Sequence, residues 1–198
     1  MSTLTLPFPT SVQVAGIDIE IDSDFRTILH CMELQGDELR KENLLEMLQL
    51  FYKKKNFFTE EHVQKMFWFF SCGREKEKRK FPRKVAGVNG KQSFDFEKDA
   101  DLIYAGFLQQ YGIDLQETKM HWWKFMILLE SLGSNTKLYK IMEYRTIDIT
   151  NKNLGKEERE FYKAMQRYYG LDSVQVLDSK SKLIEEALMN GGNVSDLL

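Results

Sequence analysis

The stretch "YGIDLQETKMHWWKFMILLESL", residues 111–132, decides how this chain folds. It opens on a turn and then sets His121, Trp122 and Trp123 side by side at the head of an apolar run. Such residues either hold a ligand or fill a core. The choice between these two roles depends on where the three side chains point.

The signals around this stretch predict one helix over residues 114–132. Gly112 ends a preceding helix, Asp114 is a favourable N-cap, and Glu117 completes a capping box three residues later. At 100° per residue, the apolar side chains fall into two arcs that thin polar strips separate. A helix with two apolar faces packs against neighbours on both sides, so we expect it at the centre of an α-helical domain.

The helical positions favour a core role for all three residues. Trp122 and Trp123 fall in different arcs, whereas a platform that stacks bases needs aromatic side chains on one exposed surface. His121 falls in the larger arc, among leucines. A zinc site takes about four ligands at short spacings, and His30 and His62 lie elsewhere in the chain. We therefore expect no bound metal and no other cofactor.

Toward the N-terminus, the chain predicts one β-hairpin followed by helices. Residues 12–21, "VQVAGIDIEI", alternate apolar and polar side chains on both sides of Ala15-Gly16, which is typical of a hairpin. Because an isolated hairpin is marginally stable, it must pack on helices or pair with another edge. Capped amphipathic stretches then predict helices within 22–35, 41–54 and 59–72.

Toward the C-terminus, further helices are predicted within 95–111, near 136–145 and over 156–169. The last of these carries four residues on the face that we expect to point inward: Phe161, Ala164, Met165 and Tyr168. An amphipathic piece, "KSKLIEEALM", then precedes a polar tail.

The predicted fold is therefore mainly α, a helical bundle-like domain with a small N-terminal β-hairpin and a mobile basic loop. The division that we predict has four parts. They are a hairpin with helices (1–72), a flexible basic loop (73–93), the second helical half of the same domain (94–170), and a C-terminal helix and tail (171–198).

The basic loop, residues 73–93, holds eight lysines and arginines against two glutamates. Clustered Lys and Arg attract the phosphates of nucleic acids, so binding of nucleic acid through Lys78, Arg79 and Lys80 is one hypothesis. A solvated loop is the favoured interpretation. The same charges could equally dock on an acidic protein surface.

The composition excludes several classes of protein. The chain has 198 residues, a net charge of -2, 42% apolar residues and 29% charged residues, which is typical of a globular domain. No run of about 18 apolar residues predicts a membrane span, and the N-terminus lacks the features of a secretory signal. Cys31 and Cys72 are predicted to be unpaired thiols in a reducing compartment, so we expect a cytoplasm.

No motif in the sequence predicts catalysis, so we expect no catalytic residues and no enzyme. The phosphate-binding, dinucleotide-binding, hydrolase and metalloprotease motifs are all missing. Asp99 and Asp101 look like a carboxylate pair, but their spacing turns them about 200° apart on a helix. Arg145 could pair with such a carboxylate as a structural ion pair.

Three segments carry a family resemblance: "FDFEKDADLIYAGFLQQYGIDL", "HWWKF" and "YRTIDI". They resemble a family of tailed-phage proteins called bacteriophage gene product fifteen, found in phages and prophages of Gram-positive bacteria. The residues that we take as its structural motif are Asp99, Tyr104, Tyr111, Asp114, His121, Trp122, Trp123 and Arg145.

The resemblance implies a role in tail morphogenesis. Genes of this family lie among tail genes, just before the tape-measure gene, a position that usually encodes tail assembly chaperones. Such a chaperone binds the tape-measure protein or tail-tube subunits, associates with itself, works in the host bacterial cytoplasm and is absent from the mature virion. The alternatives are a nucleic-acid-binding phage protein and a structural tail component that the virion retains.

A partner would be expected at the hairpin edge, by strand addition, at the basic loop, and at the exposed parts of the helices within 44–70. The candidate partner-binding residues are Val12, Val14, Ile19, Lys78, Arg79 and Lys80.

Overall fold

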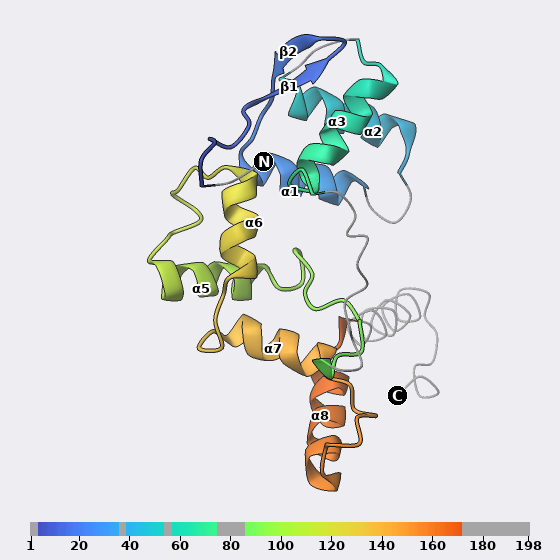
Figure 1. The fold of residues 1–198 in the computed structure, drawn as a ribbon, viewed down its shortest axis with the longest axis vertical. Helices are drawn as coiled ribbons and strands as arrows, with labels where there is room; N and C mark the ends of the chain where they lie inside the picture. The colour runs from blue at the N-terminus through green and yellow to red at the C-terminus, as the bar shows by residue number, and fades with distance from the viewer. Residues whose placement is uncertain (1–3, 36–38, 54–56, 75–85, 172–198) are drawn as a thin grey trace, which may run out of the picture. The chain divides into compact units, whose positions relative to one another are not determined.

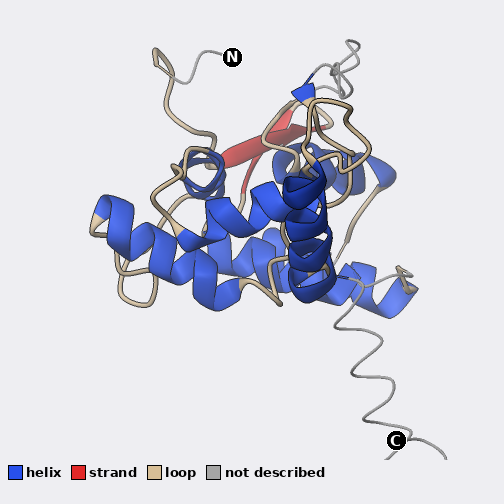
Figure 2. Ribbon diagram, turned by 90° about the horizontal axis from the view of Figure 1, so that it is seen from below, coloured by secondary structure: helices blue, strands red, loops and turns tan. Residues whose placement is uncertain are grey.

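A computed structural model of the chain describes residues 4–35, 39–53, 57–74 and 86–171. The elements in these ranges are β1 (Ser11–Val14), β2 (Ile17–Glu20), α1 (Phe25–Gln35), α2 (Lys41–Phe51), α3 (Glu60–Phe70), α5 (Ala100–Tyr111), α6 (Trp122–Glu130), α7 (Lys137–Thr146) and α8 (Lys156–Tyr169). Figures 1 and 2 show helices throughout and one two-stranded sheet. The predicted mainly α fold with an N-terminal hairpin is confirmed.

The chain divides into two compact units. Unit 1 comprises residues 1–80 and 107–132, and unit 2 comprises residues 81–106 and 133–198. The long helix α5 begins in unit 2 and ends in unit 1. This division differs from the linear one predicted from the sequence, because the segment that contains α6 packs with the N-terminal elements.

The hairpin belongs to the core of unit 1. Val12 lies opposite Ile19 and Val14 opposite Ile17 in an antiparallel register. Ala15 and Gly16 both have positive φ, as the tight turns of hairpins require. The backbone N–H of Ala15 donates to the carboxylate of Glu61 on α3, 2.9 Å away, so the turn is fastened to the helix on which β1 packs.

Aromatic rings fill most of the core of unit 1. The Phe125 ring, on α6, stacks on Phe25 of α1 and on Phe107 of α5, with centroids 4.7 and 5.1 Å away. Other large side chains are fully buried in the same unit: Phe51, Tyr52, Met66, Phe69 and Trp122. Aromatic pairs of this geometry add about 0.5–1.5 kcal/mol to the stabilisation from burial.

In unit 2, α8 packs on α7 around Tyr144, whose ring meets the Phe161 ring edge-on with centroids 5.9 Å apart. Tyr144 of α7 meets Tyr162 and Tyr169 with centroids 6.3 and 6.0 Å apart, and the Gln166 amide donates to the carbonyl of Ile147. The predicted bounds of α8 are confirmed, but its predicted inward face is correct only in part, because Ala164 and Tyr168 are exposed whereas Phe161 contacts Tyr144. No residue of α8 is buried.

The helical wheel of α8 carries two adjacent apolar faces, and α7 contacts the one that was not predicted at Tyr162 and Tyr169 and the predicted one at Phe161. Phe161, Ala164 and Tyr168 are exposed, and Met165 is half-buried at the border between the faces.

Candidate functional site

Backbone hydrogen bonds join the start of α1 to the start of α6 in unit 1. Asp24 and His121 form an isolated antiparallel bridge. The N–H of Phe25 donates to the carbonyl of Met120 at 3.0 Å, and the N–H of Trp122 donates to that of Ser23 at 2.7 Å. Two helices that are distant in sequence therefore start from one paired element.

This pairing corrects the predicted helix over residues 114–132, because α6 begins only at Trp122. Asp114 does not cap a helix of that length. Its carboxylate accepts a hydrogen bond from the N–H of Gln116, and its carbonyl accepts one from Thr118, which closes a single turn. These are the bonds of a helix N-cap, but the turn that Asp114 opens does not continue into α6.

Arg26 holds the same turn from the side of α1. Its guanidinium donates to the carbonyls of Leu115, Gln116 and Thr118, the last two at 3.1 Å. A continuous helix would use these carbonyls in its own backbone bonds, so the arginine favours the interrupted path.

His121 is the N-cap of α6 rather than a residue on the face of a helix. Its Nδ1 accepts a hydrogen bond from the N–H of Trp123 at 3.0 Å. Its Nε2 lies 3.0 Å from the carbonyl of Pro9, so Nε2 carries the proton of a neutral ring. Burial lowers the pKa of His121 below its usual 6.5, although the bond to Pro9 opposes this. The predicted structural role fits this geometry.

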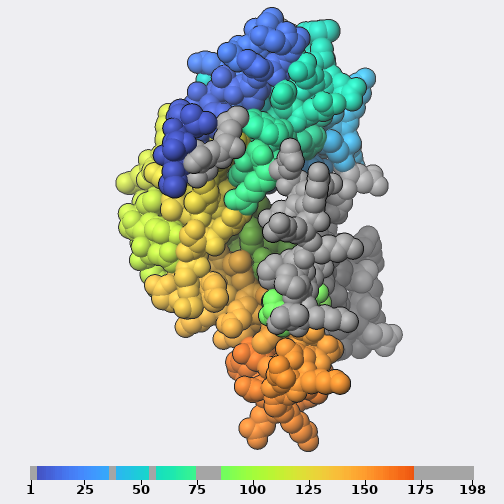
Figure 3. All heavy atoms as spheres, viewed as in Figure 1, coloured from blue at the N-terminus to red at the C-terminus, as the bar shows by residue number. Residues whose placement is uncertain are grey.

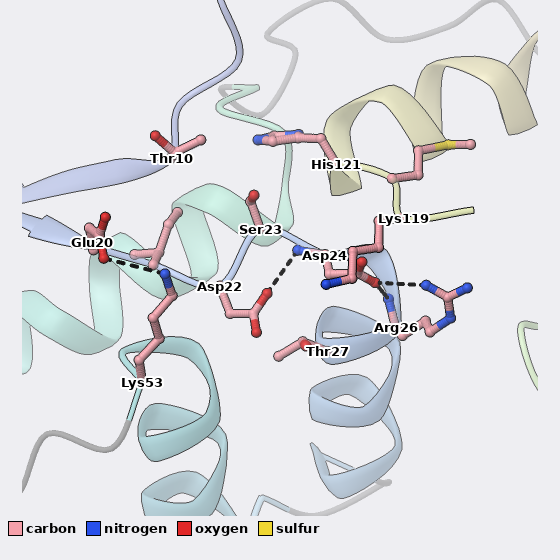
Figure 4. Close-up of a pocket in the computed structure, with 12 residues that line it drawn as sticks. Thr10, Glu20, Asp22, Ser23, Asp24, Arg26, Thr27, Lys53, Lys119 and His121 are labelled. Atoms are coloured by element: carbon pink, nitrogen blue, oxygen red, sulfur yellow. Dashed lines mark hydrogen bonds and ion pairs between the residues drawn. The ribbon is translucent and has the colours of Figure 1, made fainter. Parts of the chain in front are cut away.

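An open recess of about 590 Å³ lies beside this junction. Figure 4 shows its lining side chains, which come from the hairpin, the start of α1, the residues just after α2 and the segment before α6. Its carboxylates are already engaged: Asp22 accepts from the N–H of Asp24, and Asp24 accepts from the N–H of Arg26. The recess therefore presents side chains that stabilise the two helix starts.

Both tryptophans join α6 to the end of α3. The indole N–H of Trp122 donates to the carbonyl of Phe70 and that of Trp123 to the carbonyl of Phe69, each at 2.9 Å. These carbonyls belong to the last turn of α3, where the regular helical hydrogen bonds run out, and the Phe69 carbonyl also accepts from the N–H of Cys72 at 2.9 Å. Both indoles are buried, so the core role predicted for them fits the structure and a base-stacking platform does not.

Gly73 makes that close approach possible. It has a φ of +65°, and a Cβ there would lie 2.9 Å from the Trp123 ring. Only glycine meets both requirements without strain.

In unit 2, Arg145 of α7 forms a buried ion pair with Asp99, just before α5. The two guanidinium–carboxylate distances are 2.6 and 2.9 Å, and the residues are 7% and 2% exposed. Arg145 also donates to the carbonyls of Tyr169 and Ser93. The Arg145 side chain thus connects α7 with three other segments. Of Asp99 and Asp101, the two carboxylates considered from the sequence, Asp99 is the one that pairs with Arg145.

The remaining residues of the structural motif are placed within the fold as well. Tyr111 donates from its hydroxyl to the carbonyl of Leu128 at 2.9 Å, and Tyr104 is half-buried on α5. The motif residues do not converge on one site. Most of them bind backbone groups of distant segments, which is an architectural role.

The candidate partner-binding residues that the structure describes belong to the hairpin, where Val12 pairs with Ile19. The side chains of Val12, Val14 and Ile19 lie in the core, because the hairpin packs on α3, so they are not free to contact a partner. The basic residues Lys78, Arg79 and Lys80 lie outside the described residues.

Sequence reasoning missed Arg26. The available signal was an arginine, a side chain with several donors, in the first turn of a predicted helix and two residues after Asp24.

Two further observations concern metals and membranes. Within the described ranges, no group of three or more His, Cys, Asp or Glu side chains is arranged to hold a metal ion. Of the helices in those ranges, none has the length and apolarity that a bilayer crossing needs.

Comparison with known proteins identifies the family. The family model Bacteriophage Gp15 protein matches residues 4–171, which is most of the chain, so the chain belongs to this family. No curated protein and no solved structure matches it significantly. The resemblance seen in the sequence is confirmed, and the protein is a phage protein.

Proposed function

We propose that this member of the Bacteriophage Gp15 protein family is a tail assembly chaperone, a binding protein rather than an enzyme. Its partners are the phage tape-measure protein, tail-tube subunits or both. The observation that carries the proposal is the family match over residues 4–171, together with the tail-gene position that the resemblance implies. In this proposal the protein acts in the host cytoplasm and leaves before the virion is complete.

The architectural use of the motif residues supports this proposal. Asp99, Arg145, Trp122 and Trp123 direct their polar atoms to the chain's own carboxylate and carbonyl groups. A fold that is fixed internally in this way presents a rigid surface, and a preorganised surface binds its partner at a lower entropic cost.

Exposed apolar side chains on unit 1 supply a candidate surface. Phe57, just before α3, is 78% exposed, and Leu45 on α2 is 47% exposed. A tape-measure protein is a long helix-rich chain that is prone to aggregate before it is sheathed. Apolar side chains on and beside helices suit contacts with the apolar face of an amphipathic helix.

Co-expression with the tape-measure protein of the same phage tests the proposal. We expect this chain to keep the tape-measure protein in the soluble fraction and to co-purify with it. Leu45→Ser and Phe57→Ser should each reduce the amount that co-purifies. Leu108→Ser is a matched control, because Leu108 is a leucine of similar exposure, 45%, on α5.

Three results would count against the proposal. A tape-measure protein that is equally soluble without this chain, and that does not co-purify, removes the chaperone role. Stoichiometric amounts of the chain in purified virions would favour a retained tail component instead. Tight DNA binding at physiological salt, lost when Lys78, Arg79 and Lys80 become Ala, would favour the nucleic-acid alternative.

A further inference from the structure

A recess of about 390 Å³ in unit 2 is lined by three positively charged side chains. Lys91 comes from the segment before α5, and Arg145 comes from α7. The helix α8, whose atoms are orange in Figure 3, contributes Arg167, and Leu171 lines the recess just beyond the end of this helix. No aspartate or glutamate is among the described residues that line it. The recess therefore presents positive charge and hydrogen-bond donors.

Two of these cations have no acidic partner within the described ranges. Lys91 and Arg167 are exposed, and neither forms an ion pair with a described residue. Lys163, one turn before Arg167 on α8, is also exposed, so it adds to the positive charge instead of balancing it. A carboxylate bound in the recess would relieve the repulsion between these like charges.

Arg145 adds a buried donor to the same recess. The residue is 7% exposed, and its Nε, both N–H groups of Nη1 and one of Nη2 donate to Tyr169, Ser93 and Asp99. The fifth N–H of the guanidinium, the second one on Nη2, has no acceptor among the described residues. Polar groups that are buried this deeply are normally hydrogen-bonded. The recess therefore favours a ligand that brings acceptor oxygens.

We propose that this recess binds the acidic start of the chain's own C-terminal segment, through the carboxylates of Asp172 and Asp178. Asp172 directly follows Leu171, whose carbonyl accepts a hydrogen bond from Lys98 at 3.2 Å. The segment therefore begins at the recess itself. Residues 172–198 contain five acids and two lysines, so their net charge has the sign that the recess requires.

The covalent connection is what selects this occupant. Exposed ion pairs are individually weak, so a free acidic peptide would rarely occupy a recess with two exposed cations. A segment that begins at the recess is present at an effective concentration on the order of millimolar, and weak pairs then suffice. Nucleic acid fits less well, because contacts to so few phosphates give little affinity at physiological salt. This inference does not rest on the chaperone role.

Charge reversal tests the inference in the full-length chain, with the backbone heteronuclear NOE of residues 172–178 as the readout. In the wild type these values should approach those of α8, and about 1 M salt, where the screening length is about 3 Å, should lower them. Lys91→Glu combined with Arg167→Glu should lower the ratio of bound to free segment by on the order of tenfold or more, because like charges then meet.

The reversal of the segment provides the rescue. Asp172→Lys combined with Asp178→Lys should also release the segment, for the same reason. All four changes in one chain should restore most of the bound population, although lysine cannot accept a hydrogen bond from Arg145. Lys152→Glu combined with Lys156→Glu is the matched control and should leave the segment bound, because both are exposed lysines of unit 2 outside the recess.

Release and rescue support the inference if the control stays bound and the circular dichroism of every variant is unchanged. Low NOE values for residues 172–178 in the wild type overturn it. A bound segment that is indifferent to both reversals also overturns it, since other contacts must then hold the segment. Equal release in the control overturns it as well, because net charge and not the recess would then be responsible. A bound segment in a chain that does not co-purify with the tape-measure protein would refute the proposed function alone.

Discussion

Removing the charge of either Arg145 or Asp99 should destabilise unit 2 far more than an ordinary polar substitution. The pair is buried and bidentate, so each single change leaves an uncompensated charge away from water. Breaking such a pair from one side costs about 3–5 kcal/mol. We expect Arg145→Met and Asp99→Asn each to lie in that range.

The double variant Asp99→Leu with Arg145→Met separates the pair from its surroundings. It leaves no buried charge, and what remains is the loss of the donors to the carbonyls of Tyr169 and Ser93 and of the acceptor for the N–H of Asp95. Each lost hydrogen bond of this kind costs about 1 kcal/mol, so the double variant should cost about 1–3 kcal/mol. The sum of the two single effects would then exceed the effect of the double variant by several kcal/mol, which is a large coupling energy between the two residues.

Hydrogen exchange of the α7 and α8 amides is the suitable assay. The three tryptophans, Trp68, Trp122 and Trp123, all lie in unit 1, so their fluorescence does not report on unit 2. Asp101→Asn is the matched control, because Asp101 is an exposed acid in the first turn of α5 and should cost less than about 1 kcal/mol. Single variants that cost less than about 1 kcal/mol, or that add without coupling, would refute the reasoning.

Three further predictions concern unit 1 and use urea unfolding followed by tryptophan fluorescence. His121→Asn keeps an N-cap but removes the titrating ring. Because folding lowers the pKa of His121, the free energy of unfolding of the wild type should fall as the pH drops below 6.5, by up to about 1.4 kcal/mol per pH unit. An equally steep fall in the variant would contradict this prediction. Gly73→Ala should cost about 2–5 kcal/mol of stability, because the left-handed backbone is strained and the Trp123 ring must move. Gly112→Ala has the same φ but open space around the new Cβ, so it should cost only about 1–2 kcal/mol. Arg26→Met should cost about 1–3 kcal/mol and speed amide exchange in residues 114–119; unchanged exchange there would contradict its role.

The sequence predicts the elements of this fold well wherever local signals decide them. The turn at Ala15-Gly16 sets the hairpin, Thr59 and Gly73 bound α3, and the amphipathic pattern alone marks α8. The sequence also predicts that Arg145 pairs with a carboxylate, because a buried charge requires a partner.

Tertiary contacts decide what the sequence could not predict. The capping-box pattern at Asp114 and Glu117 favours a helix, but the carboxylate of Asp114 bonds within a turn and Arg26 binds the carbonyls of that turn. His121 therefore caps α6 instead of lying along it. On α8, the helical wheel reveals two apolar faces but not that Tyr144 of α7 contacts Tyr162 and Tyr169 on one of them and Phe161 on the other.

Capture of the tagged chain from phage-infected cells before lysis tests the central claim most directly. The tape-measure protein should be the phage protein most enriched with the wild-type chain, and a nuclease treatment should leave that enrichment unchanged. Leu45→Ser and Phe57→Ser should lower the enrichment while Leu108→Ser does not. Captured material without the tape-measure protein or tail-tube subunits, or an enrichment that nuclease abolishes, would contradict the account.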